Sequence, residues 1–101
     1  MPIKVKISVS ANPKKKYTAI FYEEDGTKIK TTHFGQKSAD DYTKTNNDDR
    51  KKLYLARHKK RENWNDYKSA GALSRWILWN KKTLHDSKLD FVKRFNLKLI
   101  K

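Results

Sequence analysis

The chain has 101 residues, of which 36% are apolar and 12% aromatic, and its 25 lysines and arginines against 11 acids give a formal net charge of +14. This length fits one domain with one core, and the absence of cysteine excludes disulfides and thiolate metal sites. Because no stretch approaches the ~20 apolar residues of a transmembrane helix, and the start lacks the apolar run of a signal peptide, we expect neither a membrane span nor secretion.

The net charge predicts an anionic partner, because self-repulsion at +14 opposes the compact state. Nucleic acid is the first candidate, and an acidic protein surface or anionic lipid comes second; the alternative is that the charge only keeps the protein soluble. The charge is dispersed, with +4 in residues 1–34, +3 in 35–66 and +7 in 67–101. We therefore expect broad contact with a polyanion rather than a basic tail.

The first third of the chain has the pattern of β-strands. Residues 3–9 alternate apolar side chains with lysine or serine, which predicts a half-buried strand. A second β-rich run covers 16–23, and a third covers 27–34. Between them stands Asp25-Gly26, a strong hairpin signal. Residues 1–35 are therefore predicted to form an antiparallel β-meander.

Helical patterns follow Gly35. Residues 38–43 predict one short turn. A helix is expected over 48–64, because an asparagine cap and the pair Asp48-Asp49 stand where a helix N-terminus favours negative charge.

Two further helices complete the predicted core. Around residues 72–79 apolar side chains surround the helix axis except at Ser74 and Arg75, which predicts a buried helix. Thr83 and Asp86 have the spacing of a capping box for a last helix. The expected core residues on these helices are Trp76, Ile77, Trp79, Phe91 and Phe95.

These elements define an α+β fold, with a small N-terminal antiparallel β-meander packed against three C-terminal helices. Residues 1–101 are expected to form a single domain, with the meander in 1–35, a helical part in 36–96 and a closing segment in 97–101. Since Leu97 and Leu99 alternate with lysine, the closing segment is a candidate for a short strand.

The densest positive charge lies in residues 50–61, with seven lysines and arginines and no acid. On a helix the arginines would form a stripe with one tyrosine, which suits a phosphate backbone and one stacked base. The predicted nucleic-acid contacts are Arg50, Lys51, Lys52, Tyr54, Arg57, Lys59, Lys60 and Arg61. In the alternative interpretation, the arginine heads pair with Asp40, Asp41 or Glu62 instead. Trp64, at the end of this helix, is open to a core or a surface role.

Signals of catalysis are weak. The three histidines stand apart on different elements, adjacent acids do not converge on one point, and the glycines form no phosphate-binding loop. We therefore expect a protein that is not an enzyme and that holds no metal and no cofactor.

Three segments together resemble a known family: "HFGQKSADDYT", "DDRKKLYLARHKKRENW" and "SAGALSRWILWNKKTL". They are similar to small basic proteins of large DNA viruses of protists and algae, of the mimivirus and phycodnavirus kind, which share a domain of unknown function. The resemblance covers about residues 16–95. It implies a viral origin and a location in the virion or in the cytoplasm or nucleus of an infected cell, and it brings no activity.

Three functions remain open at this point. The first is a non-enzymatic viral protein that binds nucleic acid, DNA in preference to RNA, through phosphates and without sequence specificity. The second is a minor capsid protein that bridges larger acidic subunits. The third, an effector that binds a host protein, has only small size in its favour.

Overall fold

Alternating apolar and polar residues build one four-stranded sheet in the order β3-β2-β1-β4. The structure, a computed structural model, describes residues 3–100. β1 (Lys4–Val9), β2 (Lys15–Tyr22) and β3 (Lys28–Gln36) form the predicted antiparallel meander. β4 (Lys98–Ile100) is the predicted closing strand, and it pairs with β1 in parallel. The α+β fold class is therefore confirmed.

The β2–β3 hairpin turns at the predicted Asp25-Gly26 pair. Gly26 has a φ of +95°, which L-residues rarely adopt. The backbone N–H of Thr27 donates to Asp25 Oδ1 at 2.9 Å, so the aspartate fixes the turn from its side chain.

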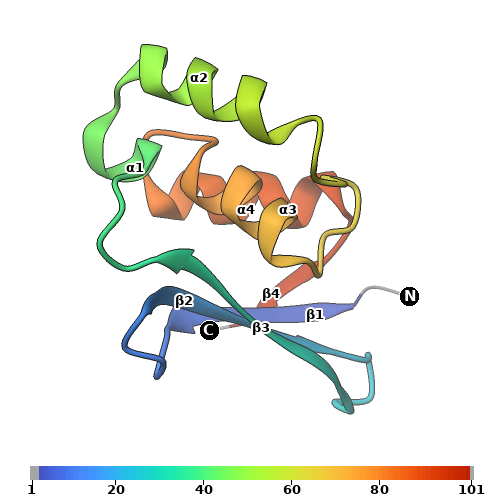
Figure 1. Cartoon of the computed structure of the whole chain (residues 1–101). Helices are drawn as coiled ribbons and strands as arrows, with labels where there is room; N and C mark the ends of the chain where they lie inside the picture. Colours follow the sequence, from blue (N-terminus) through green and yellow to red (C-terminus); the bar gives the residue numbers. More distant parts are fainter. Residues whose placement is uncertain (1–2, 101) are drawn as a thin grey trace.

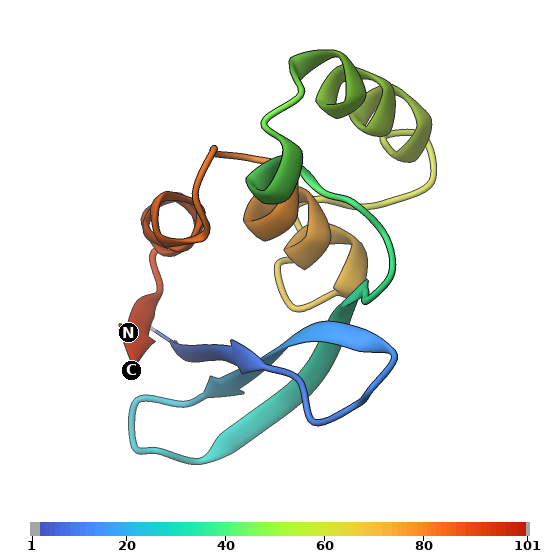
Figure 2. The ribbon, with the colours of Figure 1, turned by 90° about the vertical axis from the view of Figure 1, so that its left-hand side faces the viewer.

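The helices all lie on one side of the sheet, some packed directly on it and one stacked beyond them (Figures 1 and 2). They are α1 (Tyr42–Thr45), α2 (Asp48–His58), α3 (Ala70–Leu73), the π-helix η1 (Ser74–Leu78) and α4 (Leu84–Arg94). Among them α2 lies farthest from the sheet (Figure 1). Within residues 3–100, no helix combines the length and the apolar character needed to cross a membrane.

Two helix starts are confirmed in detail. Asn47 caps α2 by accepting a hydrogen bond from the Arg50 N–H at 3.1 Å. Thr83 caps α4 by accepting from the Asp86 N–H at 3.1 Å.

Two helix boundaries were predicted wrongly. The helix expected over 48–64 ends at His58, and the N–H groups of Arg61 and Glu62 turn back onto the His58 carbonyl at 3.0 and 3.1 Å. The physical reason is that residues 59–63 offer no apolar side chain to bury, so packing does not extend the helix there. The short turn expected over 38–43 is α1, which begins only at Tyr42 because Asp41 caps it.

The helix that holds two tryptophans is not uniformly α-helical. It continues from α3 into η1, where the Trp79 N–H donates to the Ser74 carbonyl, five residues earlier, at 3.1 Å. Leu73, Ile77 and Leu78 are buried here, whereas Trp76 and Trp79 are only partly buried.

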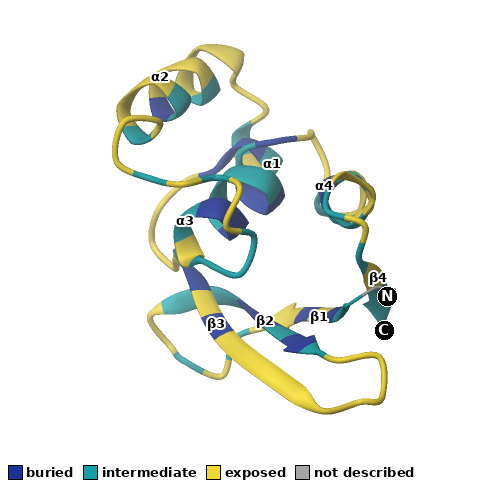
Figure 3. Ribbon diagram, turned by 90° about the vertical axis from the view of Figure 1, so that its right-hand side faces the viewer, coloured by how far each residue is buried: buried dark blue, intermediate teal, exposed yellow. Residues whose placement is uncertain are grey.

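The core lies between the sheet and the layer formed by α3, η1 and α4. Buried residues from all of these elements form one cluster: Val5, Ile7, Ala19, Phe21, Phe34, Leu73, Ile77, Leu78 and Phe91. Of the predicted core residues, Ile77 and Phe91 are fully buried, while Trp76, Trp79 and Phe95 are partly buried and pack against the cluster. Figure 3 shows that exposed residues concentrate on α2 and on the β2–β3 hairpin.

Candidate nucleic-acid interface

Helix α2 is attached to the body of the protein by an aromatic stack. The centre of the Tyr54 ring lies 4.4 Å from the centre of the Trp79 ring, and the two planes make an angle of 7°. On the same ring stacks His58, whose ring centre lies 4.1 Å from that of Tyr54. Burial raises the pKa of Tyr54 well above its ordinary value, so the phenol stays neutral. Only 8% of Tyr54 is exposed. The predicted stacking of Tyr54 on a base would therefore require the ring to leave Trp79 and His58, and the sequence does not show that these rings lie opposite it.

Lys51 also belongs to this attachment. Its Nζ donates to the carbonyl oxygen of Asn80 at 2.6 Å and lies 4.8 Å from the centre of the Tyr42 ring. Partial burial, followed by the charges of Arg75 and Lys81, lowers the pKa of Lys51. In this structure Lys51 therefore holds α2 against the body, and the predicted phosphate contact would have to replace these interactions.

Arg50 follows the alternative interpretation, because its guanidinium pairs with Asp40 at 2.9 Å. Lys44 approaches the same carboxylate at 3.4 Å. Hydrogen bonds from Arg50 and then Lys44 lower the pKa of Asp40. Both partners of the Arg50 pair are substantially exposed, so the pair contributes little stability, and a phosphate would have to displace Asp40.

The other two acids of that alternative pair with different residues. Asp41 is buried, accepts from the Nζ of Lys16 and caps α1. Glu62 lies 3.4 Å from His58 and accepts from Trp64 Nε1 at 3.1 Å. Trp64 therefore lies outside the helix that we expected it to end, with its indole N–H already bonded.

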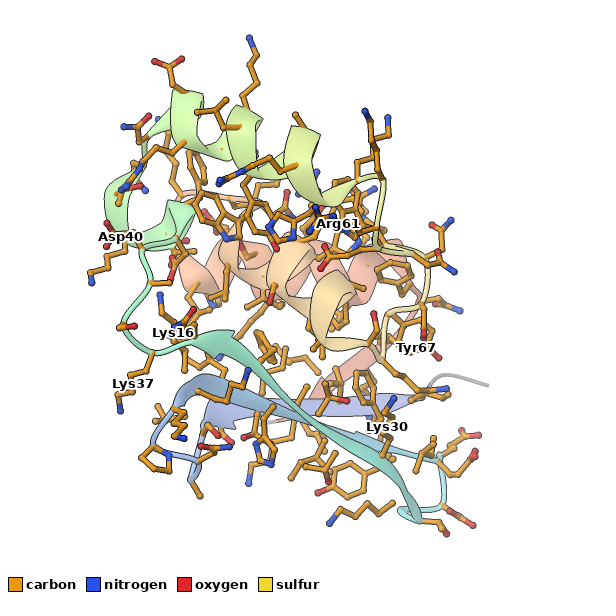
Figure 4. All side chains as sticks on the ribbon, in the orientation of Figure 1. Lys16, Lys30, Lys37, Asp40, Arg61 and Tyr67 are labelled. Carbon is orange, nitrogen blue, oxygen red and sulfur yellow. The ribbon has the colours of Figure 1, made fainter. Side chains whose placement is uncertain are left out.

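The remaining predicted contacts are exposed. In the part of the chain that the structure describes they enter no ion pair, and they lie on α2 and in the connection that follows: Lys52, Arg57, Lys59, Lys60 and Arg61. Because α2 ends at His58, the three arginines do not share one helical stripe. Figure 4 shows Asp40 near the start of α2 and Arg61 beyond its end. We call these five residues the α2 cation group.

Beside this attachment, a cleft of about 530 Å³ lies between α2 and the body. Cations and acids both line it: Lys15, Lys16, Arg50, Arg57, Asp40, Asp41 and Glu62. Since the charges largely offset one another, the cleft is not an anion pocket. Among the described residues, no group of three or more histidines and acids could hold a metal ion.

A second set of cations was missed by reasoning from sequence. Lys4, Lys6 and Lys98 lie on the face of the sheet that the helices leave uncovered. The alternation in β1 places its lysines opposite the core, and that signal was visible in the sequence. What the sequence did not show is the strand order, which brings Lys98 beside Lys4.

A family model matches residues 5–58, from β1 to the end of α2, which is more than half of the chain. The model is that of DUF5754, described as a family of unknown function, and the chain belongs to this family. No curated protein and no solved structure matches the chain.

Proposed function

We propose that this protein is a non-enzymatic binder of nucleic acid that contacts phosphates and does not read sequence. The observation that carries the proposal is the α2 cation group, five exposed lysines and arginines within ten residues that enter no ion pair among residues 3–100. Phosphate oxygens carry no base identity, so contacts of this kind give affinity without specificity.

The organisation of α2 supports this role. Tyr54 and Lys51 fix one side of the helix to the body, so the exposed cations are presented on a defined surface. Non-specific binding of this kind has dissociation constants of about 10⁻⁴–10⁻⁶ M at physiological salt. If each of the five cations contacts one phosphate of duplex DNA, log K should fall against log salt with a slope of about −4 to −5.

The resemblance to proteins of large DNA viruses adds a setting to the proposal. In that setting the partner is viral nucleic acid, DNA in preference to RNA, in the particle or in the infected cell. The alternative, a minor capsid protein between acidic subunits, draws on the same cations. The two functions overlap, because a protein on the inner side of the shell could also contact the packaged genome. They differ in whether binding of nucleic acid is the principal interaction.

The direct test is fluorescence anisotropy with labelled duplex DNA, single-stranded DNA and RNA at several salt concentrations. Binding that weakens steeply as salt rises supports the proposal. No binding at low salt, together with recovery of the protein in the shell fraction of purified particles, would instead support the capsid role.

The double variant Arg57→Glu/Arg61→Glu tests the assigned surface. It should lower affinity about tenfold or more, because two phosphate contacts become repulsions. The matched control is Lys37→Glu/Lys93→Glu, exposed lysines elsewhere, since both doubles lower the net charge from +14 to +10. Equal losses in the two doubles would mean that net charge, and not the α2 cation group, determines binding.

A further inference from the structure

The uncovered face of the sheet brings lysines and apolar side chains into register across three strands. In one row Lys98 lies beside Lys4, and Lys4 lies beside Tyr22. In the next row Ile100 lies beside Lys6, and Lys6 lies beside Ile20. Along β1 the two lysines are about 6.7 Å apart, the spacing of alternate residues in a strand. We call these six residues the outer sheet face.

Nothing in the described structure covers this face. The helices all lie on the opposite side of the sheet (Figures 1 and 2). Ile20, Tyr22 and Ile100 are partly exposed and lie outside the core cluster and the side chains packed against it. Among residues 3–100, the ring of Tyr22 packs against no other aromatic ring, whereas Tyr17, Tyr54 and Tyr67 each do.

The charge on this face is uncompensated within the sheet. Lys4 and Lys98 are direct neighbours across β1 and β4, and like charges in that position repel. The six residues include no acid. Asp25 in the β2–β3 turn interacts with the charge of Lys4, but only weakly. The pKa of Asp25 is lowered mainly by hydrogen bonds from Thr27 and only slightly by the Lys4 charge. An anionic ligand would remove this repulsion.

We infer that the outer sheet face binds single-stranded nucleic acid, with Tyr22 stacking on a base and Lys4, Lys6 and Lys98 contacting phosphates. Charge complementarity selects a polyanion, and the unpartnered ring beside the lysines selects one with exposed bases. A duplex keeps its base faces stacked inside, so it would use the lysines but not the ring. The inference rests on the proposed function and adds a second surface and a strand preference to it.

The first experiment maps the surface by NMR. A ¹⁵N-labelled sample of the whole chain is titrated at low salt with the 12-mers dT12 and U12. Backbone amide shifts should change in β1, β4 and the end of β2, and tighter binding of either oligonucleotide shows which of the two polymers is preferred. Shifts confined to α2 and residues 59–61 would overturn this inference and leave the proposed function intact. Absence of binding to either oligonucleotide and to duplex DNA would overturn both.

The second experiment separates stacking from charge. Tyr22→Ala should weaken binding of dT12 about tenfold and change duplex binding less than twofold, because only the single strand uses the ring. Tyr22→Phe, which keeps a ring and preserves packing, should restore dT12 binding to within twofold. If Tyr22→Ala and wild type bind dT12 equally, Tyr22 does not stack on a base.

Polyglutamate of similar length is the competing polyanion. At equal charge concentration it should bind at least tenfold more weakly than dT12, since it offers carboxylates but no flat bases. Equal binding of the two polymers would overturn the inference in favour of an acidic protein partner.

Discussion

At the scale of single residues, the fold depends on two kinds of contact: those between side chains close in the sequence and those between side chains far apart in it. The caps at Asn47 and Thr83 and the turn at Gly26 depend on side chains within a few residues, and the structure confirms them. The roles of Tyr54 and Lys51 depend on Trp79 and Asn80, which are more than twenty residues away. A helical wheel of α2 alone could not distinguish an attached side chain from a free one.

Gly35 shows how a residue can be required for two reasons at once. Its φ is +78°, and a Cβ there would lie 2.7 Å from Leu78 Cδ1 and 3.3 Å from Lys16 Cβ. Gly35→Ala should therefore lower the free energy of unfolding by about 2–4 kcal/mol, from backbone strain and overpacking together. Urea denaturation followed by tryptophan fluorescence measures this change.

The matched control is Gly26→Ala, where φ is +95° but nothing lies within 4 Å of the added Cβ. It should cost only the backbone strain, about 1–2 kcal/mol. If both substitutions lower the free energy of unfolding equally, the Leu78 side chain moves aside at no cost in free energy. Gly35 would then be needed only for its positive φ.

At the scale of elements, the sequence predicted the existence and order of strands and helices better than their extent. Alternation and helical spacing are strong signals in β1 and α4, where each buried position follows the expected period. The end of α2 and the π-helical geometry of η1 depend on packing against other elements, which no window of sequence contains. Parallel pairing of β4 with β1 was equally beyond local patterns.

Helix α2 is an element whose stability should depend mainly on the stack of Tyr54 on Trp79. Tyr54→Ala removes the ring between α2 and Trp79, so we expect the free energy of local opening of α2 to fall by about 3 kcal/mol. Hydrogen exchange followed by mass spectrometry should show loss of protection in residues 48–58 while β2 stays protected.

Two variants control for this experiment. Tyr54→Phe keeps the ring, and Leu53→Ala changes a neighbour that is 61% exposed, so each should change protection by less than about 0.5 kcal/mol. If Tyr54→Ala lowers protection equally in β2 and α2, the helix unfolds with the whole chain and the stack is not a separate attachment.

At the scale of the whole molecule, the α2 cation group and the outer sheet face lie on opposite sides of the core. The helix layer separates them, with α2 farthest from the sheet (Figure 1). A ligand that reaches both surfaces must therefore wrap around the protein or use two strands. A compact ligand would engage one surface at a time.

The dispersed charge should make the stability of the free protein depend on salt. Between about 0.01 M and 0.15 M ionic strength the screening length falls from about 30 Å to about 8 Å, so mutual repulsion weakens and the melting temperature should rise. Lys98→Glu places an opposite charge beside Lys4 and should stabilise the protein by about 0.2–1 kcal/mol at the lower salt.

Thermal unfolding followed by circular dichroism at both salt concentrations measures the melting temperature. Lys98→Gln, which only removes the charge, should have a melting temperature between those of wild type and Lys98→Glu. Destabilisation by Lys98→Glu at low salt would show that repulsion across the β1–β4 pair is negligible.

The position of β4 also bears on how the molecule is made. β1 is synthesised first, yet one of its two hydrogen-bonded neighbours, β4, consists of residues 98–100. While the ribosome adds the intervening residues, β2 is the only one of these two neighbours with which β1 can pair, and the other edge of β1 stays unpaired. That edge is a template for pairing with another nascent chain, so the interval before residue 98 emerges is the period of greatest risk of misassembly.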